Sequence, residues 1–211
     1  MNMTRSIVVA MAATISAASH ADFIGFEGED SINGEGNNVV KMYATFDSAS
    51  NVLLNVFNSD IAGDYIHSDV QIGAGGTWLP NASLDIPNFS DSENDSYVTI
   101  GYGVGTSAAT NATALDPNFL DATGGIGGTV PSQAGWYNGN PSNDMMGERI
   151  LVGQFVFSSD LADFEFNAQV GFKTDPNTSE VLFGSGSWSI PAPGALALLG
   201  LGGLGARGRR G

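Results

Sequence analysis

The residues of this chain best suited to chemistry are carboxylates, and Asp91, Glu93 and Asp95 are a notable cluster. Their spacing puts oxygen ligands at positions one, three and five of a loop, as at the start of an EF-hand calcium site. Position six is Ser96 rather than glycine, and position twelve is Tyr102 rather than glutamate. The segment is therefore not an EF-hand. It is either a solvated acidic turn, which we favour, or a looser Ca²⁺ loop, and Ca²⁺ is the one candidate cofactor.

Histidine and cysteine chemistry is nearly excluded. The chain has no cysteine, and His67 is the only histidine outside the N-terminal segment that contains His20. A Ser-His-Asp relay needs three side chains that converge in space, which the adjacent residues His67, Ser68 and Asp69 cannot supply. No Gly-x-Ser-x-Gly nucleophile motif is present either. We expect His67 to lie in a solvated loop or at a strand edge, and we predict no catalytic residue.

Carboxylates and aromatic residues leave two other functions open. Two carboxylates suffice for glycoside hydrolysis, and the chain has 22 acidic residues. A hydrolytic cleft is usually lined with aromatic residues, but Trp78, Trp136-Tyr137 and Trp188 are scattered along the sequence. The same aromatic residues could stack on sugar rings without catalysis, or Trp78 and Trp188 could simply pack in a core.

Charge is distributed very unevenly along the chain, whose net charge is −15. All 22 acidic residues lie between Asp22 and Glu180, and the only cations among them are Lys41, Arg149 and Lys173, so this body carries 3 − 22 = −19. Such a surface repels nucleic acid and anionic lipid and attracts multivalent cations. The alternative is that the charge serves solubility or suits a salty medium.

Residues 1–21 have the three parts of a secretory signal peptide. Arg5 supplies a positive start, residues 7–18 are mostly apolar, and Ser19 and Ala21 place small residues at the −3 and −1 positions of a cleavage site. The apolar stretch has no polar face and is too short to span a bilayer comfortably. We therefore expect export and cleavage after Ala21.

The C-terminal end has three features in order. Pro191-Ala192-Pro193 precedes the apolar residues 195–204, and the chain ends with Arg207, Arg209 and Arg210. As a helix, residues 194–206 would reach only about 20 Å at 1.5 Å per residue, which is shorter than the roughly 30 Å hydrocarbon core of a membrane. The arginines should hold this end on the cytoplasmic side.

This order of features resembles the PEP-CTERM sorting signal of Gram-negative bacteria. In that family a Pro-Glu-Pro motif, a short apolar helix and a basic terminus are read by exosortase, a membrane-embedded cysteine protease. The resemblance covers residues 190–211, and Ala192 stands in place of the glutamate. It implies that Pro191, Pro193 and the three arginines direct processing by an exosortase-like protease after the secretion machinery. The alternative is a tail retained as a weak membrane anchor.

The segment between the two ends favours strands joined by turns. Apolar and polar residues alternate over 164–172 and 39–46, which indicates strands with one face on a core. Two mostly apolar stretches, 52–57 and 150–157, predict more fully buried strands, and 97–102 and 181–190 are further candidates. Glycine-rich turns lie between them, and no sustained helical period appears. Residues 108–147 are weakly patterned, which predicts a long irregular excursion.

The predicted fold is therefore all-β: an antiparallel β-sandwich or jelly roll over residues 22–189, flanked by an N-terminal signal helix and a short C-terminal apolar helix. The predicted domains are a signal peptide at 1–21, the body at 22–189 and the sorting tail at 190–211. The leading function is a non-enzymatic cell-surface or extracellular-matrix protein that contacts the membrane only transiently. The alternatives are a carbohydrate-binding or adhesive module, with or without Ca²⁺ assistance, and a hydrolase acting on exopolysaccharide.

Overall fold

The computed structural model describes residues 22–67, 78–80, 94–103, 113–119, 128–140, 142–158, 161 and 163–190. The two expected flanking helices lie outside these residues, as do the processing residues Ala21, Pro191, Pro193, Arg207, Arg209 and Arg210. In the described part of the chain no helix is long and apolar enough to cross a membrane.

The described strands form two sheets. The first sheet has the order β1-β2-β8-β4, which are Phe23–Ile32, Asn38–Phe46, Arg149–Phe157 and Tyr97–Val98. The second has the order β10-β9-β3-β6-β5, which are Leu182–Ser189, Glu165–Lys173, Val52–Ala62, Ala134–Asn138 and Thr113–Leu115; β7, Met145–Met146, also pairs with β3. All of the pairings are antiparallel, so the predicted antiparallel all-β class is confirmed.

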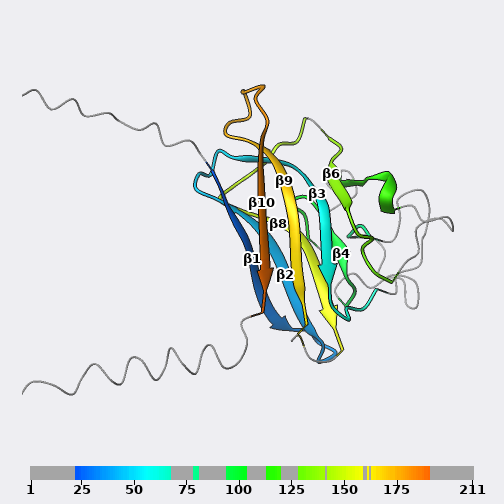
Figure 1. Cartoon of the computed structure of the whole chain (residues 1–211). Helices are drawn as coiled ribbons and strands as arrows, with labels where there is room; N and C mark the ends of the chain where they lie inside the picture. Colours follow the sequence, from blue (N-terminus) through cyan, green and yellow to red (C-terminus); the bar gives the residue numbers. More distant parts are fainter. Residues whose placement is uncertain are drawn as a thin grey trace, which may run out of the picture.

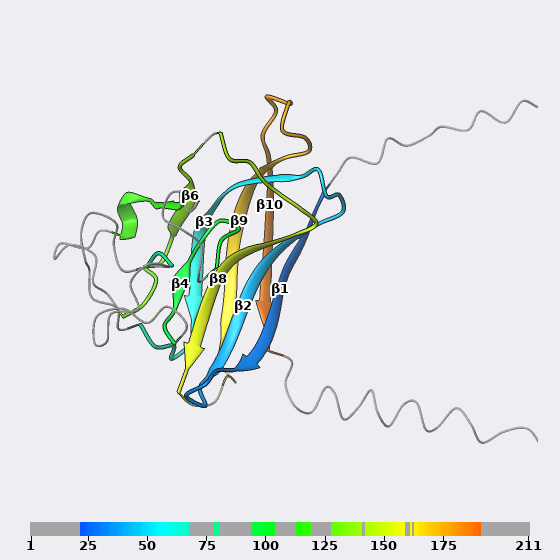
Figure 2. The same ribbon diagram turned by 180° about the vertical axis from the view of Figure 1, so that it is seen from behind.

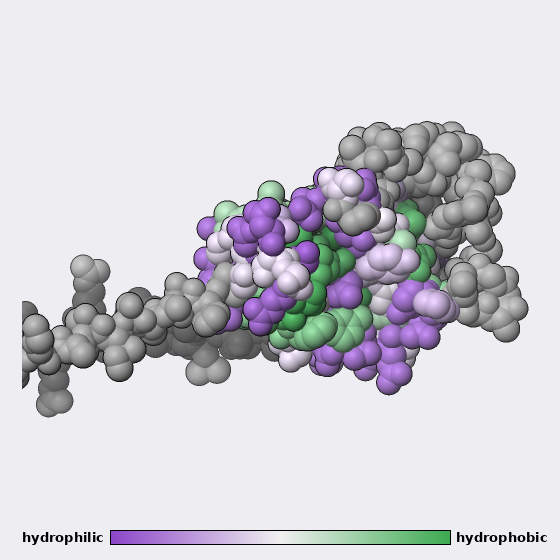
Figure 3. Space-filling view, turned by 90° about the horizontal axis from the view of Figure 1, so that it is seen from above, coloured by the Kyte–Doolittle hydropathy of each residue, from purple (hydrophilic) through white to green (hydrophobic). Residues whose placement is uncertain are grey.

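The two sheets lie against each other as the layers of a sandwich. In Figure 1 the second sheet is in front of the first. Figure 2 shows the molecule from behind, with the first sheet in front. Aromatic rings join the layers: Phe166 of β9 lies 4.9 Å from Phe26 of β1 and 6.0 Å from Phe155 of β8 between ring centroids. Seen from above, hydrophobic residues gather in the middle and hydrophilic residues surround them (Figure 3).

The alternating segments form strands with the expected faces. In β9 the apolar members Phe166, Ala168, Val170 and Phe172 are buried, because a strand turns successive side chains to opposite faces of its sheet. In β2 the residues Val40, Met42, Ala44 and Phe46 are buried in the same way. The two mostly apolar stretches lie in β3 and β8, and the expected strand at 181–190 is β10. The expected strand at 97–102 is only the two-residue β4.

Two parts of the fold differ from the sequence-based prediction. Strand β1 was not predicted, because glycines and acidic residues interrupt its apolar residues and only Phe26 is buried. The prediction that 108–147 is an irregular excursion was wrong for its described part. That part contains β5, β6, β7 and the 3₁₀ turn η1 (Pro117–Phe119), and the three strands all extend the second sheet. Each is short, and their partners are distant in sequence, so local patterning is weak.

Glycines bring the two sheets together along the edge formed by β1 and β10. A Cβ atom on Gly28 of β1 would lie 2.4 Å from the Trp188 ring of β10, and one on Gly184 of β10 would lie 2.4 Å from Phe23 of β1. The two aromatic rings therefore occupy the space that side chains at these glycines would fill. They close this side of the core.

Candidate binding surface

The predicted calcium loop is only partly within the described residues. Asp91 and Glu93 lie outside them. Asp95 is 2% exposed, and its Oδ2 lies 3.3 Å from Nδ1 of His67. This carboxylate faces a buried imidazole rather than solvent. No group of three or more possible metal ligands occurs among the described residues.

His67 is not in a solvated position, so that prediction was wrong. Its side chain is 1% exposed, and its ring stacks on Trp78 with centroids 3.7 Å apart and an interplanar angle of 17°. Its Nδ1 also lies 2.9 Å from the backbone oxygen of Ser96. An imidazole combines a flat ring with polar nitrogens, so it can be buried when both find contacts. The sequence shows the residue type but not this stacking partner.

The segment that contains Asp95 is hydrogen-bonded to β8 of the first sheet. The Gln154 side chain donates to the Asp95 backbone oxygen at 3.1 Å, and the Val156 N–H donates to the Ser96 hydroxyl at 2.9 Å. Asp95 and Ser96 precede β4, and these buried hydrogen bonds to β8 take the place of regular strand-to-strand hydrogen bonds there. Together with the stack on Trp78, they make the His67 region a packed structural junction.

The neighbouring tyrosine of this junction is also buried. Burial raises the pKa of Tyr65 to about 12 from the ordinary 10.0, and the hydrogen bond that its hydroxyl accepts from Val130 N–H opposes this rise. The ring makes an edge contact with Trp78, with centroids 6.2 Å apart. The protonated, neutral phenol is therefore the form that the fold accommodates.

The tryptophans do not form an exposed platform. Trp78 and Trp136 are each 1% exposed in the core, and the Trp136 indole N–H donates to the Thr99 backbone oxygen at 2.9 Å. Trp188 is half-buried over Gly28. The core-packing alternative for Trp78 is therefore confirmed. Tyr137, which follows Trp136 and points to the opposite face of its strand, is 44% exposed.

The outer face of the second sheet presents a different aromatic set. Antiparallel register places Phe183 of β10, Gly171 of β9, Asn55 of β3 and Tyr137 of β6 in one row across four strands. Phe183 is 70% exposed. We call this row and the outward residues of β10, β9 and β3 beside it the outer face. Half-buried Phe57 supports Phe183 with an edge-to-face contact, with ring centroids 6.0 Å apart.

The middle of the row is an amide. Asn55 Oδ1 accepts the N–H of Gly171 at 2.8 Å, and a Cβ atom at Gly171 would lie 2.4 Å from that oxygen. The register shift of β3 between Leu53 and Asn55 brings this side chain into the ladder. The Asn55 Nδ2 donor makes no hydrogen bond within the described residues. The row is therefore two exposed rings with an anchored amide between them.

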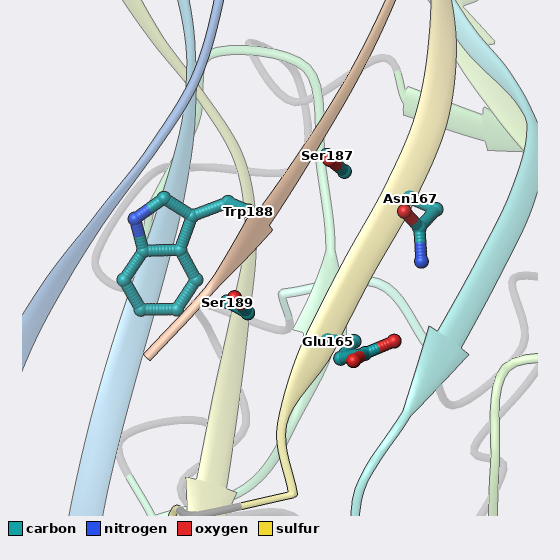
Figure 4. Close-up of a pocket in the computed structure, with 5 residues that line it drawn as sticks. All are labelled: Glu165, Asn167, Ser187, Trp188 and Ser189. Carbon is teal, nitrogen blue, oxygen red and sulfur yellow. The ribbon is translucent and has the colours of Figure 1, made fainter. Parts of the chain in front are cut away.

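Polar groups continue the outer face toward the end of β10. Glu165 and Asn167 of β9 and Ser187, Trp188 and Ser189 of β10 line a shallow hollow of about 110 Å³. In Figure 4 the Trp188 ring points away from the hollow, and the other four side chains lie on the same side of the sheet as the hollow. Between the hollow and the aromatic row lie Ser185 and Gln169, and Gln169 accepts a hydrogen bond from the Asn58 amide at 3.1 Å.

The outer face of the first sheet has a different character. Arg149 forms ion pairs with Glu29 at 2.7 Å and Glu27 at 3.2 Å, and its guanidinium lies 3.4 Å from the centroid of the Tyr43 ring. The two glutamates therefore offset the charge of this arginine locally.

Comparison with protein-family profiles, curated proteins and solved structures found no match to this chain. Its function must therefore be inferred from its own residues and their geometry.

Sequence reasoning missed the outer face for an identifiable reason. Phe183 and Asn55 are unremarkable in the sequence, and only strand register brings them into one row. One signal was present: Phe183 precedes the alternating run Gly184-Ser185-Gly186-Ser187, in which an aromatic ring falls on the same face as the serines.

Proposed function

We propose that this chain is an exported, non-catalytic protein of the cell surface or extracellular matrix, whose β-sandwich presents a binding face. Export is supported by the signal-like residues 1–21 and by the tail at 190–211. The observation that carries the binding role is the row of Phe183, Asn55 and Tyr137, because large exposed rings on a rigid sheet are otherwise a liability in a soluble protein.

A hydrolytic role is less well supported. Trp78 and Trp136, which could have lined a catalytic cleft, are packed in the core. His67 is packed against Trp78 and Asp95, so a substrate could reach it only if that junction opened.

The location can be tested on intact cells of a Gram-negative host that has an exosortase. Cells producing the full chain are treated with a protease that does not cross membranes, and the body should be digested while a cytoplasmic protein is protected. The matched variant Arg207→Ser, Arg209→Ser, Arg210→Ser should accumulate as an uncut precursor. A body that stays protected inside intact cells would contradict the proposal.

The non-catalytic part has its own test. In His67→Phe a ring still stacks on Trp78 but the imidazole is lost. The parent and this variant are assayed with esterase, protease and glycosidase substrates, and neither should show turnover. An activity of the parent that disappears in the variant, with an unchanged circular dichroism spectrum, would overturn this part.

A further inference from the structure

We propose that the outer face of the second sheet binds a single chain of a neutral polysaccharide, which stacks on Phe183 and Tyr137 and hydrogen-bonds to the amides and hydroxyls beside them. This inference rests on the proposed function and names the ligand class of its binding face.

The spacing of the two rings suits an elongated ligand. Phe183 and Tyr137 are separated by three strand intervals, which is about 14 Å at roughly 4.8 Å per interval. Both rings are on strands of the sheet, and Phe57, on the same face, contacts the more exposed ring from the side. Two fixed rings at this separation can contact different units of one polymer at little cost in side-chain entropy.

The groups between and beside the rings match the hydroxyl groups of a sugar. A sugar ring has apolar C–H faces, which pack on aromatic rings, and hydroxyl edges, which both donate and accept hydrogen bonds. Asn55, Gln169, Ser185, Asn167 and Ser187 supply amides and hydroxyls that can also do both. Asn55 is already held by Gly171, so its Nδ2 donor is fixed in place near the centre of the row.

Charge selects a neutral ligand. The body carries −19, which repels anionic polymers. The row of the rings, Phe183, Gly171, Asn55 and Tyr137, has no formal charge, and neither has the row beside it toward the hollow, Ser185, Gln169 and Phe57. Glu165 lines the hollow, Asp60 lies beside Asn167 there, and Lys173 is in the next row on the other side of the rings.

The size of the face favours one polymer chain over a protein partner. The eight residues of β10 extend about 27 Å, and four strands span about 14 Å, which gives roughly 400 Å². A stable protein interface buries about 800 Å² on each partner. A second copy of this chain would therefore need additional contact surface outside this face.

The test is the retention of the full chain on insoluble polysaccharides. The purified chain is mixed with the neutral polymers cellulose, chitin, starch and β-1,3-glucan, and with covalently cross-linked, calcium-free beads of anionic alginate, and the protein left in solution is measured. The expected result is retention on at least one neutral polymer and none on alginate. Phe183→Ser and Tyr137→Ser should each raise the dissociation constant at least tenfold, and the double variant should abolish retention.

Ile32→Ser is the matched control, because Ile32 of β1 is 72% exposed and Phe183 is 70% exposed. It should leave retention unchanged. Equal retention of the double variant, equal loss in the control, retention only on alginate, or no retention on any neutral polymer would each overturn the inference. A parent dimer that the double variant converts to a monomer in light scattering would identify a second copy as the occupant and would also overturn it.

The inference and the proposed function can fail separately. The double variant is also produced in the exosortase-containing host, where it should reach the surface like the parent. If the parent reaches the cell surface but binds no neutral polymer, the proposed location stands and only the proposed ligand class is wrong. A parent that remains inside the cell removes the proposed function, whatever the polymer assay gives.

Discussion

Phe166 and Phe183 lie on opposite faces of the second sheet, and truncating each to alanine should have very different effects on stability. Phe166 is fully buried between Phe26 and Phe155, which belong to the opposite sheet. Removing such a buried ring costs about 3–5 kcal/mol of unfolding free energy. Phe183 is 70% exposed, so the burial it loses is about a third of a side chain, which amounts to less than about 1 kcal/mol.

The assay is urea unfolding of the body, residues 22–189, followed by tryptophan fluorescence, together with thermal melting. For a chain of this size each 1 kcal/mol lowers the melting temperature by about 2–4 °C, so Phe166→Ala should melt about 6–20 °C lower. Phe183→Ala should melt within about 4 °C of the parent. If Phe183→Ala is as destabilising as Phe166→Ala, the assignment of inner and outer faces is wrong, and the proposed binding face is wrong too.

Three further predictions concern burial, packing and charge. At pH 7, Tyr65→Phe should lower the free energy of unfolding by about 1–3 kcal/mol, because the buried Val130 N–H loses its acceptor. Urea unfolding measures this difference. Between pH 10 and pH 12 the unfolding free energy of the parent should fall by roughly 3 kcal/mol more than that of Tyr65→Phe, because the unfolded Tyr65 ionises near 10 and the folded one near 12; parallel curves would refute the burial effect. Gly28→Ala should lower the free energy of unfolding by about 1–3 kcal/mol, because its Cβ would press against the Trp188 ring. Gly34→Ala is the control: its Cβ has open space around it, so apart from the local backbone preference the change should be less than about 0.5 kcal/mol. Added NaCl should raise the melting temperature of the −19 body, and CaCl₂ at matched ionic strength should raise it equally; a larger shift with CaCl₂ would reveal a specific site.

The strands that could be predicted are those whose pattern is local. The alternation in β9 and β2 marks one buried face, and the mostly apolar runs in β3 and β8 mark central strands, so the local pattern suffices for them. Strand β1 was missed because most of it is exposed, and β5, β6 and β7 were missed because they are short and are stabilised by distant partners.

The sites could be predicted less well than the fold. The burial of His67 depends on Trp78 and on Asp95, which are 11 and 28 positions away in the sequence. The binding face depends on strand register, which aligns Phe183 with Asn55 across 128 positions. Contacts of this kind arise from the whole fold, and no short motif encodes them.

The most direct test of the proposed function is the intact mass of the protein recovered from the surface of its native cells. The mature chain should begin at Asp22 and end close to Pro191-Ala192-Pro193, without the arginines of residues 207–210, because both ends are proposed to be addresses and the sandwich between them the working protein. A surface-located chain that still begins at Met1 or still ends at Gly211 would contradict the account.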